Sequence, residues 1–263
     1  MLLAIDCGNT NISFAVFDGA TVVAKWRASS QANKTADEHA VWLTQLMQLA
    51  GISASDIDRA IIANVVPPAT YALRSLCERY FGVKPLFVGQ PGVETGVPVR
   101  IERPEQVGVD RLVNCVAAQE RYGGPLIVID FGTATTFDIV GPDGGYEGGV
   151  IAPGINLSIE ALYRAAAQLP RITPEKPAQV IGKATAPAMK SGVFWGYIGL
   201  IEGLVARIQA EYGAEMRVIS TGGLAPLFAE ATDAIGEVDG DLTLRGLHLI
   251  DAMNPGQGGA DPR

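Results

Sequence analysis

Two short segments carry the strongest signal in this chain: Asp6-Cys7-Gly8-Asn9-Thr10-Asn11 and Asp130-Phe131-Gly132-Thr133-Ala134-Thr135-Thr136. Each follows an apolar run, Leu2-Leu3-Ala4-Ile5 or Leu126-Ile127-Val128-Ile129, that is typical of a buried strand. Each therefore places a carboxylate at a strand end, a glycine two residues later, and then small hydroxyl or amide side chains. Because glycine has no Cβ, its backbone N–H can approach a phosphate closely. The repetition predicts two similar halves that face each other across a nucleotide.

The composition is that of a folded, soluble protein. Apolar residues make up 48% of the 263 residues and charged residues 18%, which excludes a disordered chain. A formal net charge of −8, without a lysine- and arginine-rich stretch, argues against nucleic acid as a partner. No apolar run reaches the roughly 20 residues of a membrane span. The chain starts without the basic segment of a signal peptide, and its cysteines lack metal-binding spacing, so we expect a cytoplasmic protein with reduced thiols.

Predicted strands and helices alternate along the chain, which favours an α/β fold. The first helix should begin at the capping box Thr35-Ala36-Asp37-Glu38 and end near Gly51, with Val41 and Leu49 among the residues on its inner side. The other predicted elements are strands at 12–17, 22–26, 60–65, 84–88 and 216–220, and helices from 67 to about 80, from about 110 to 121, and from roughly 187 to 212.

The chain also shows a weak internal repeat. Aligning Asp6 with Asp130 aligns Gly8 with Gly132, and both second strands then reach an Asp-Gly turn, at 18–19 and 143–144. We therefore predict an N-terminal half at 1–122 and a C-terminal half at 123–253. The segment 254–263, rich in glycine and proline, is predicted to be a disordered tail.

The two strand-end carboxylates indicate a metal-bound nucleotide. An ionised Asp6 or Asp130 only accepts hydrogen bonds and repels phosphate, so a cation or a water must stand between them. Thr10 and Asn11 add donors that suit phosphate oxygens. One such corner alone would most simply be a tight turn. The pair, each after a buried strand, favours the nucleotide.

A third segment, Gly108-Val109-Asp110-Arg111, begins a predicted helix. The positive end of a helix should keep Asp110 ionised, so that it could accept a proton from a substrate hydroxyl. Arg111 could hold a substrate carboxylate through a bidentate pair. Asp is also a common residue at helix N-termini, and from these four residues alone the capping role is the simpler interpretation.

The ordered set of motifs resembles that of type III pantothenate kinases, from Asp6 to about Asn254. The motifs are Asp6-x-Gly8-Asn9-Thr10, Gly108-Val109-Asp110-Arg111, Asp130-Phe131-Gly132-Thr133, Gly148-Gly149-x-x-x-Pro153-Gly154, Ile181-Gly182-x-x-Thr185, Ser191-Gly192 and Thr221-Gly222-Gly223. Each motif is weak alone, but the order is highly specific. The resemblance implies the acetate and sugar kinase, chaperone ATPase and actin superfamily. Its fold is α/β, with two ribonuclease-H-like halves of mixed sheets flanked by helices and a nucleotide cleft between them.

The resemblance also implies a role for each motif. ATP would be bound by Asp6, Cys7, Gly8, Asn9, Thr10, Asn11, Ile12, Ser13 and Thr133. Pantothenate would be bound by Gly108, Val109, Asp110, Arg111 and Thr185, with Asp110 as the catalytic base. Asp130 would coordinate a monovalent cation, K⁺ or NH₄⁺, and Mg²⁺ would accompany ATP. Gly222 and Gly223 stand where the superfamily keeps glycines near the nucleotide. One departure is Ile101, at a position where relatives often carry a tyrosine.

The implied activity is ATP-dependent phosphorylation of pantothenate to 4′-phosphopantothenate, the first step of coenzyme A biosynthesis. The alternatives are another small-molecule kinase of the superfamily, a non-catalytic nucleotide-binding regulator, and an actin-like polymer-forming ATPase. The segment from Gly108 to Arg111 and the short length of the chain favour pantothenate. The joint presence of five residues argues against an inactive protein: Asp6, Asp110, Arg111, Asp130 and Thr185.

The resemblance further implies a homodimer with the substrate pocket near the subunit interface. The aromatic cluster Phe194-Trp195-x-Tyr197 lies within the predicted long helix. It is either internal packing or part of that interface, and the sequence does not separate the two. His39 and His248 are isolated from other metal ligands, so we expect both to be structural or solvated.

Overall fold

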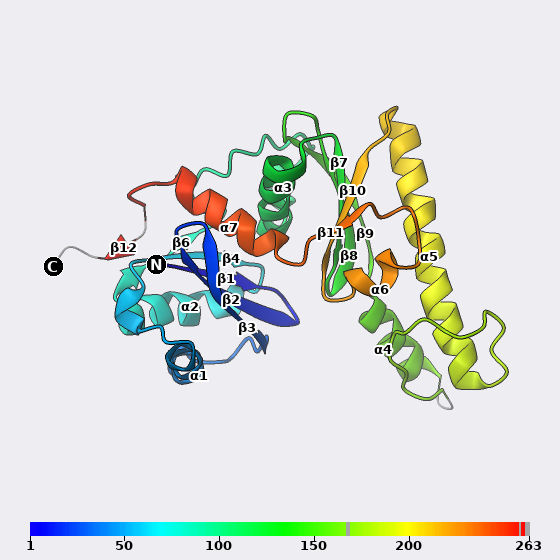
Figure 1. Cartoon of the computed structure of the whole chain (residues 1–263), viewed down its shortest axis with the longest axis horizontal. Coiled ribbons are helices and arrows are strands. Elements are labelled where there is room, and N and C mark those ends of the chain that lie inside the picture. Colours follow the sequence, from blue (N-terminus) through cyan, green and yellow to red (C-terminus); the bar gives the residue numbers. More distant parts are fainter. Residues whose placement is uncertain (167–168, 258, 261–263) are drawn as a thin grey trace. The chain divides into compact units, whose positions relative to one another are not determined.

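The computed structural model describes residues 1–166, 169–257 and 259–260. Its internal contacts divide the chain into two compact units, whose elements are labelled in Figure 1. Unit 1 comprises Met1–Pro98, Glu102–Ala117 and the chain from Leu242 onward. Unit 2 comprises Val99–Ile101 and Ala118–Asp241. Each unit has its own sheet and its own hydrophobic core.

Unit 1 is built on a five-stranded sheet in the order β3-β2-β1-β4-β6. Its strands are β1 (Leu2–Cys7), β2 (Asn11–Asp18), β3 (Thr21–Ser29), β4 (Arg59–Asn64) and β6 (Leu86–Phe87). The first three strands are antiparallel neighbours, whereas β4 runs parallel to β1 and β6 parallel to β4. Because β1 is central, both of its faces are buried, and this explains its continuous apolar sequence.

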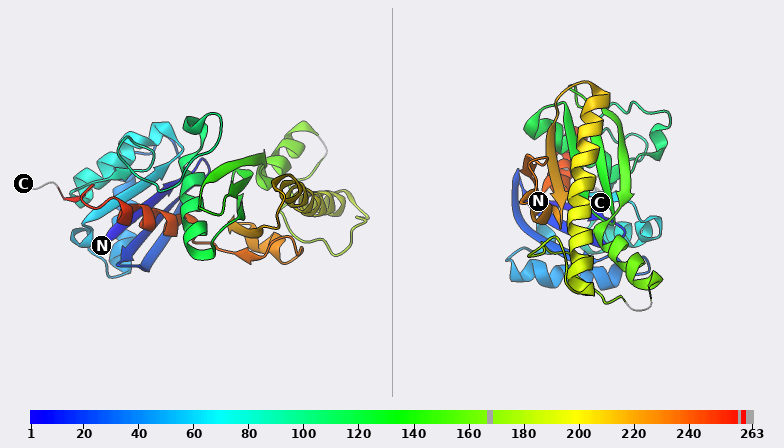
Figure 2. Two further views of the ribbon diagram at one scale, coloured as in Figure 1. Left: turned by 90° about the horizontal axis from the view of Figure 1, so that it is seen from above. Right: turned by 90° about the vertical axis from the view of Figure 1, so that its right-hand side faces the viewer.

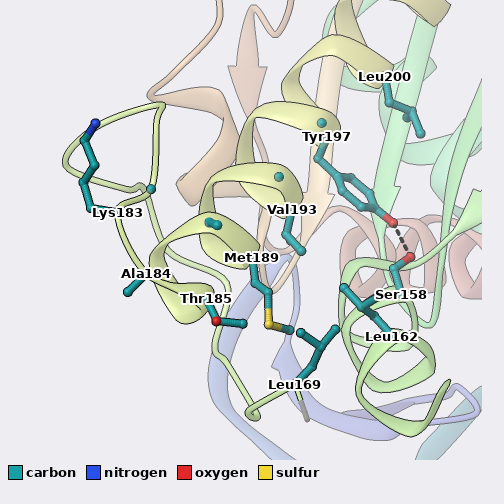
Figure 3. Close-up of a pocket in the computed structure, with 14 residues that line it drawn as sticks. Ser158, Leu162, Leu169, Lys183, Ala184, Thr185, Met189, Val193, Tyr197 and Leu200 are labelled. Atoms are coloured by element: carbon teal, nitrogen blue, oxygen red, sulfur yellow. Dashed lines mark hydrogen bonds between the residues drawn. The ribbon is translucent and has the colours of Figure 1, made fainter. Parts of the chain in front are cut away.

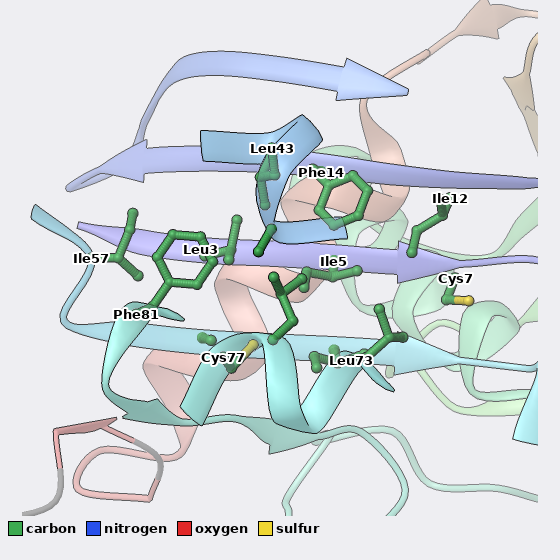
Figure 4. Packing of buried hydrophobic residues seen from close by; sticks show 14 of the residues in the cluster. Leu3, Ile5, Cys7, Ile12, Phe14, Leu43, Ile57, Leu73, Cys77 and Phe81 are labelled. Carbon is green, nitrogen blue, oxygen red and sulfur yellow. The ribbon is translucent and has the colours of Figure 1, made fainter. Parts of the chain in front are cut away.

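Helices cover both faces of this sheet. On one face, α1 (Ala36–Leu49) and α2 (Thr70–Leu76) pack against side chains such as Leu3 and Ile5, and α2 continues into a π-helical turn at Cys77–Phe81 (Figure 4). On the other face lie α7 (Leu242–Met253) and the start of α3 (Val109–Tyr122). There, Leu247 and Val113 are completely buried. The unit 1 core therefore has two layers of helix around one sheet.

Helix α1 begins at the predicted capping box but buries a different face from the predicted one. The Thr35 hydroxyl accepts a hydrogen bond from the Glu38 N–H, and the Glu38 carboxylate accepts one from the Thr35 N–H. Its buried residues are Ala36, His39, Ala40, Leu43 and Met47. Val41 and Leu49 are 69% and 85% exposed, so their predicted inward packing was wrong. Val41 lies about 100° beyond Ala40 around the helix axis and thus points away from the core.

Unit 2 contains a second five-stranded sheet, in the order β11-β10-β7-β8-β9. Its strands are β7 (Leu126–Phe131), β8 (Ala134–Val140), β9 (Tyr146–Pro153), β10 (Arg217–Gly222) and β11 (Glu237–Val238). One face packs against α4 (Ile155–Ala165), α5 (Thr185–Tyr212) and α6 (Ala225–Ala229). Figure 2 shows the long α5 helix lying across these strands. Among the described residues, no helix is both long and apolar enough to cross a membrane.

Of the two alternatives for the aromatic cluster on α5, internal packing describes two of its members. Phe194 is 1% exposed and stacks on Phe228 of α6, with ring centroids 5.4 Å apart. Tyr197 also contacts Phe228, at 5.9 Å between centroids. These rings therefore belong to the core of unit 2. His39 is likewise a buried structural residue, and its ring lies against Phe14. This burial lowers its pKa to about 4.

The internal repeat is confirmed at the level of topology. In each sheet, three antiparallel strands are followed by two parallel ones. Strands β1 and β7 have the same burial pattern, and Asp6 pairs with Ser13 in one hairpin as Asp130 pairs with Thr136 in the other. Both hairpins are also followed by a register shift, between Val16 and Phe17 and between Ile139 and Val140. The predicted fold class, mixed sheets flanked by helices, is correct.

The two units differ from the predicted ranges 1–122 and 123–253. The segment Val99–Ile101 belongs to unit 2, because Val99 forms a bridge with Tyr146 and Arg100 forms ion pairs with Asp143 and Glu147. The chain from Leu242 onward returns to unit 1, where α7 fills the core. Both differences come from contacts between residues far apart in sequence, which local patterns do not reveal.

The predicted disordered tail at 254–263 also differs from the structure. Asn254 is 3% exposed, and its side chain exchanges two hydrogen bonds with the backbone of Glu94. Gln257 donates to the Gly92 carbonyl, and β12 (Gly259–Ala260) pairs with β5 (Val83–Lys84). Residues 258 and 261–263 lie outside the described residues. The polar, glycine-rich composition of this segment gave no indication of these hydrogen bonds with distant backbone groups.

Candidate functional site

The first corner is the tight turn between β1 and β2 in unit 1. The Gly8 N–H donates to the Asn11 carbonyl at 3.0 Å, and a Cβ at position 8 would lie 3.2 Å from that oxygen. The turn leaves Asn9 and Thr10 exposed at its tip and Asp6 half-buried at the strand end. It therefore presents amide, hydroxyl and backbone donors beside one carboxylate, which suits the oxygens of a polyphosphate.

Two of the residues predicted to bind ATP at this corner point into the core. Cys7 and Ile12 are each 2% exposed and belong to the apolar cluster under the sheet. Burial raises the pKa of the Cys7 thiol to about 11, so the thiol is neutral at physiological pH. These two residues can reach a nucleotide only through their backbone, whereas Asn11 and Ser13 are half-buried.

The second corner, between β7 and β8 in unit 2, repeats this construction with a shorter turn. The Gly132 N–H donates to the Ala134 carbonyl at 3.0 Å, which leaves Thr133 exposed. The turn is held from outside by Gly154, whose N–H donates to the Thr133 carbonyl at 3.1 Å. A Cβ at position 154 would lie 2.1 Å from that oxygen. The glycine of the Pro153-Gly154 motif is therefore required for contact with the second corner.

Asp130 lies beside a second required glycine. Strand β10 pairs with β7 so that Gly222 stands opposite Phe131. The φ angle of Gly222 is +91°, and a Cβ there would lie 2.6 Å from the Phe131 carbonyl oxygen and 2.9 Å from Asp130 Oδ1. The Thr221-Gly222-Gly223 motif thus belongs to the same corner as Asp130, although it lies about ninety residues later in the sequence.

The groups around Gly222 fit a cation held by oxygen atoms. A carboxylate oxygen of Asp130 and the carbonyl oxygen of Phe131 both lie close to the space that the missing Cβ leaves. Such hard donors suit alkali and alkaline-earth ions. The described residues contain no group of three or more His, Cys, Asp or Glu side chains that could hold a metal ion. A cation here would complete its coordination with oxygens of water or ligand.

The Asp110 carboxylate lies at the start of α3 in unit 1, folded back over Gly108. The Gly108 carbonyl accepts from the N–H groups of Arg111 and Leu112 at 3.1 and 3.4 Å, so it begins the helix. Asp110 Oδ1 accepts from the Arg111 N–H at 2.9 Å, and a Cβ at position 108 would lie 2.5 Å from that oxygen. Glycine at 108 is what permits this side-chain conformation.

The electrostatic environment of Asp110 combines burial with a hydrogen bond and a nearby positive charge. Desolvation raises its pKa above the ordinary value, although the hydrogen bond from the Arg111 N–H and the Arg111 charge act in the opposite direction. That Asp110 is ionised, as a base requires, stays a prediction. A carboxylate with a raised pKa is a stronger base, which suits proton abstraction from a hydroxyl.

Thr185 lies in a separate feature of unit 2, an apolar groove of about 980 Å³ between α4 and the start of α5 (Figure 3). Thr185 is the first residue of α5. Leu162, Leu169 and Met189 gather along the groove, and Lys183 stands at its edge. An apolar groove with a few polar groups suits a small organic molecule with an anionic end.

The structure places the predicted site residues in two groups. Unit 1 carries Asp6 to Ser13 and Gly108 to Arg111, and unit 2 carries Asp130, Thr133 and Thr185. Within unit 2, Asp130, Thr133 and Gly222 meet at one end of the sheet. Ile101 packs near Gly148, since a Cβ at 148 would lie 3.9 Å from its Cγ2. Sequence patterns did not reveal that the Tyr197 hydroxyl donates to the Pro153 carbonyl and the Ser158 hydroxyl to the Gly154 carbonyl. No local spacing marks these contacts.

Comparison with known proteins identifies relatives along the whole chain. The family model described as "Type III pantothenate kinase" matches residues 2–207. A type III pantothenate kinase of Rhodospirillum rubrum is 64% identical over 254 residues, which cover 97% of this chain and 99% of that protein. A second, from Paramagnetospirillum magneticum, is 62% identical and covers 97% and 98%. Among solved structures, a Baf family transcriptional activator from Campylobacter jejuni has a TM-score of 0.61 at 20% identity, covering 96% of this chain and 98% of that one. That likeness supports the fold alone.

Replacing Gly222 tests the crowding around Asp130. We expect Gly222→Ala to lower the affinity for ATP at least about tenfold, because a Cβ at 2.6 Å from the Phe131 carbonyl must displace the corner. The matched control is Gly213→Ala, since Gly213 also has a positive φ, +79°, but nothing within 4 Å of its Cβ position. It should cost about 1 kcal/mol of stability and leave ATP affinity unchanged. Calorimetric titration with ATP measures the affinity of both variants. Equal affinities for ATP would show that Gly222 is not part of the ATP-binding site.

Proposed function

This chain belongs to the type III pantothenate kinase family, and we propose that it transfers the γ-phosphoryl group of ATP to the primary hydroxyl of pantothenate. The observation that carries the proposal is the Asp110 carboxylate, held over Gly108 at a helix start with its pKa raised by burial. It is a carboxylate whose basicity burial increases, within the motif that the resemblance assigns to pantothenate. The product would be 4′-phosphopantothenate, which enters coenzyme A biosynthesis.

ATP would contact both corners. At the first corner, Gly8, Asn9, Thr10, Asn11 and Ser13 would supply backbone and side-chain donors, and Cys7 and Ile12 only their backbone. At the second corner, the exposed Thr133 would add a further contact. As in other kinases, a divalent metal would accompany the triphosphate, and Asp6 would face it through water. These assignments rest on the turn geometry together with the family resemblance.

Asp130 would hold a monovalent cation, K⁺ or NH₄⁺. The Phe131 carbonyl oxygen supports this assignment, because it lies beside Gly222 together with Asp130 Oδ1 and could be a second oxygen ligand. When bound, such an ion would offset negative charge on the phosphates. Phosphoryl transfer depends mainly on positioning and on charge neutralisation, so the rate should respond to this ion.

Pantothenate would be bound by the segment from Gly108 to Arg111 and by Thr185. The hydroxyl oxygen attacks the γ-phosphorus in line, the bond to the β–γ bridging oxygen breaks, and ADP leaves. Asp110 accepts the hydroxyl proton as the new O–P bond forms. Arg111 and Thr185 would orient the acceptor, and Arg111 is suited to its carboxylate.

The central prediction is an acceptor-dependent release of ADP. With ATP and Mg²⁺, the purified protein should release ADP only when pantothenate is added, and faster in K⁺ or NH₄⁺ than in Na⁺. A coupled assay measures the rate, with acetate and a hexose as control acceptors. Turnover with those acceptors alone would indicate a different kinase of the superfamily. No turnover with any acceptor would indicate a binding protein, and acceptor-free hydrolysis with sedimenting polymer would indicate an actin-like ATPase.

The proposed base gives a second prediction. Asp110→Asn should lower kcat by about 10²–10⁴-fold, because general-base assistance is typically of that size, while calorimetry still detects pantothenate binding. Glu105→Gln, an exposed acid in the preceding turn, is the control and should retain wild-type turnover. Full activity of Asp110→Asn would remove Asp110 from this role.

The pH profile of the wild type provides a further check on the same residue. Asp110 must be ionised to accept a proton, so kcat/KM should fall as pH decreases through its pKa. Because burial raises that pKa, the fall should be centred above the ordinary value of 3.8. This acid limb should disappear from the residual activity of Asp110→Asn.

We further propose that the protein is a homodimer that acts in the cytoplasm. The three cysteines are buried and form no disulfide, as expected for a reducing compartment. Helix α5 exposes Gly199, which does not line the apolar groove, and nothing lies within 4 Å of its Cβ position. A glycine costs an isolated helix about 1 kcal/mol relative to alanine, a cost that close packing of a second subunit would offset.

This proposal predicts the oligomeric state of one variant. Sedimentation should show a dimer for the wild type and a monomer for Gly199→Arg, whose side chain fits the isolated chain but not a close helix contact. Glu211→Arg, about 120° around the helix, is the control and should remain dimeric. A dimer of unchanged affinity in Gly199→Arg would place any interface elsewhere.

A further inference from the structure

Two hydroxyl groups hold the turn that joins β9 to α4 in unit 2. The Tyr197 hydroxyl on α5 donates to the Pro153 carbonyl, the last residue of β9. The Ser158 hydroxyl on α4 donates to the Gly154 carbonyl at 3.0 Å. The two hydroxyl oxygens are 3.2 Å apart, which is the interaction dashed in Figure 3. Two helices therefore fasten adjacent carbonyls of one turn.

Each of these hydroxyl groups has a single hydrogen to donate. When Tyr197 donates to the Pro153 carbonyl, its oxygen can still accept from Ser158. Ser158 then has two possible acceptors at similar distance, the Tyr197 oxygen at 3.2 Å and the Gly154 carbonyl at 3.0 Å. The pair has two hydrogen-bond arrangements, and a polar ligand group beside it would favour one of them.

The turn held by this pair contacts the second corner directly. Gly154 donates to the Thr133 carbonyl at 3.1 Å, and the absent Cβ would lie 2.1 Å from that oxygen and 2.8 Å from the Gly132 carbonyl. Because the Gly154 N–H is hydrogen-bonded to the Thr133 carbonyl, and the missing side chain lets the two backbones lie close together, a shift of the turn displaces Thr133 or breaks this bond. The position of Thr133 thus depends on the turn that Tyr197 holds.

The same hydroxyl pair also forms part of the wall of the apolar groove. Tyr197 and Ser158 line it together with Thr185, Met189 and Leu162 (Figure 3). Tyr197 is 8% exposed, and its ring packs on Phe228. Because Tyr197 is buried and its hydroxyl is hydrogen-bonded to the Pro153 carbonyl, a small movement of the ring moves that carbonyl with it.

We propose that Tyr197, assisted by Ser158, is a positioning residue that couples occupation of the groove to the placement of Thr133 at the second corner. The inference rests on the proposed function, in which Thr185 contacts pantothenate and Thr133 contacts ATP. A molecule in the groove presses on Tyr197 and Ser158, and these hold the turn that fixes Thr133. The acceptor therefore increases the affinity for the nucleotide, and by linkage the nucleotide increases the affinity for the acceptor.

The test is a measurement of this coupling in the full chain. Calorimetry gives the affinity for adenylyl imidodiphosphate, with Mg²⁺ and K⁺, in the absence and presence of saturating pantothenate. In the wild type we expect pantothenate to increase this affinity by about fivefold or more, within the usual range of coupling between sites. In Tyr197→Phe, which keeps the ring but removes the hydroxyl, the factor should fall below about twofold. By the same linkage, the apparent affinity for pantothenate in the presence of the nucleotide should fall by a similar factor, whereas the affinity of the free protein for each ligand should change little.

Two further variants separate coupling from a loss of structure. Tyr212→Phe removes a hydroxyl at the partly exposed end of the same helix and should keep the wild-type factor. Ser158→Ala retains the bond from Tyr197 to Pro153 and should give an intermediate factor. It also keeps the proposal testable if Tyr197→Phe fails to fold, which thermal melting would show.

The outcomes distinguish this inference from the proposed function. Absence of wild-type turnover with pantothenate would contradict the function itself. Turnover with a coupling factor near one in the wild type would contradict only the coupling. An undiminished factor in Tyr197→Phe, or in Ser158→Ala where Tyr197→Phe does not fold, would overturn the role of the hydroxyl pair. A lowered melting temperature with unchanged coupling would identify these residues as purely structural.

Discussion

The oxygen atoms at the candidate site lie against glycine backbone, at distances that a Cβ would not permit. Asp110 Oδ1 lies over Gly108, Asp130 Oδ1 lies beside Gly222, and the Thr133 carbonyl lies against Gly154. Gly108 lies at the start of a helix, Gly222 at the end of a strand and Gly154 in a turn. A Cβ at any of these positions would collide with the oxygen, so the observed positions of these oxygens require glycine. Defined positions of this kind are what phosphoryl transfer requires from a protein.

Burial then decides what each of these groups can do. The Cys7 thiol and the Ile12 side chain are buried under the sheet, which leaves only backbone, amide and hydroxyl groups at the first corner. At Asp110, desolvation outweighs the hydrogen bond and the charge of Arg111 and makes the carboxylate a better base. A base that contributes about 10²–10⁴-fold to the rate lowers the barrier by roughly 3–5 kcal/mol. A single hydrogen bond such as that of Tyr197 is worth about 1 kcal/mol, which suits modulation more than chemistry.

The repeated sheet explains how one architecture provides two different corners. Both hairpins are formed by a central buried strand and its antiparallel neighbour, and both place an aspartate at the strand end. The first turn closes from Gly8 to Asn11 and the second, one residue shorter, from Gly132 to Ala134. In both units the residue after the third strand of the sheet holds the corner: the Ser30 N–H donates to the Thr10 carbonyl at 2.9 Å, and the Gly154 N–H donates to the Thr133 carbonyl at 3.1 Å. In the proposed function, the same topology would provide a phosphate-binding turn in one unit and a cation-binding corner in the other.

Local sequence patterns by themselves determined the strand-end aspartates, the repeat and the capping box at Thr35, because burial of a strand and capping of a helix depend on residues close together in the chain. The ordered motifs also indicated the family, which the comparisons confirm. Tertiary structure alone decided that Gly222 stands beside Asp130, that Asn254 is buried against Glu94, and that Val41 faces outward. It also decided the direction of the Asp110 pKa shift and the link from Tyr197 to Pro153. These features depend on strand pairing, burial and side-chain packing between distant parts of the chain, and no spacing within a single segment encodes them.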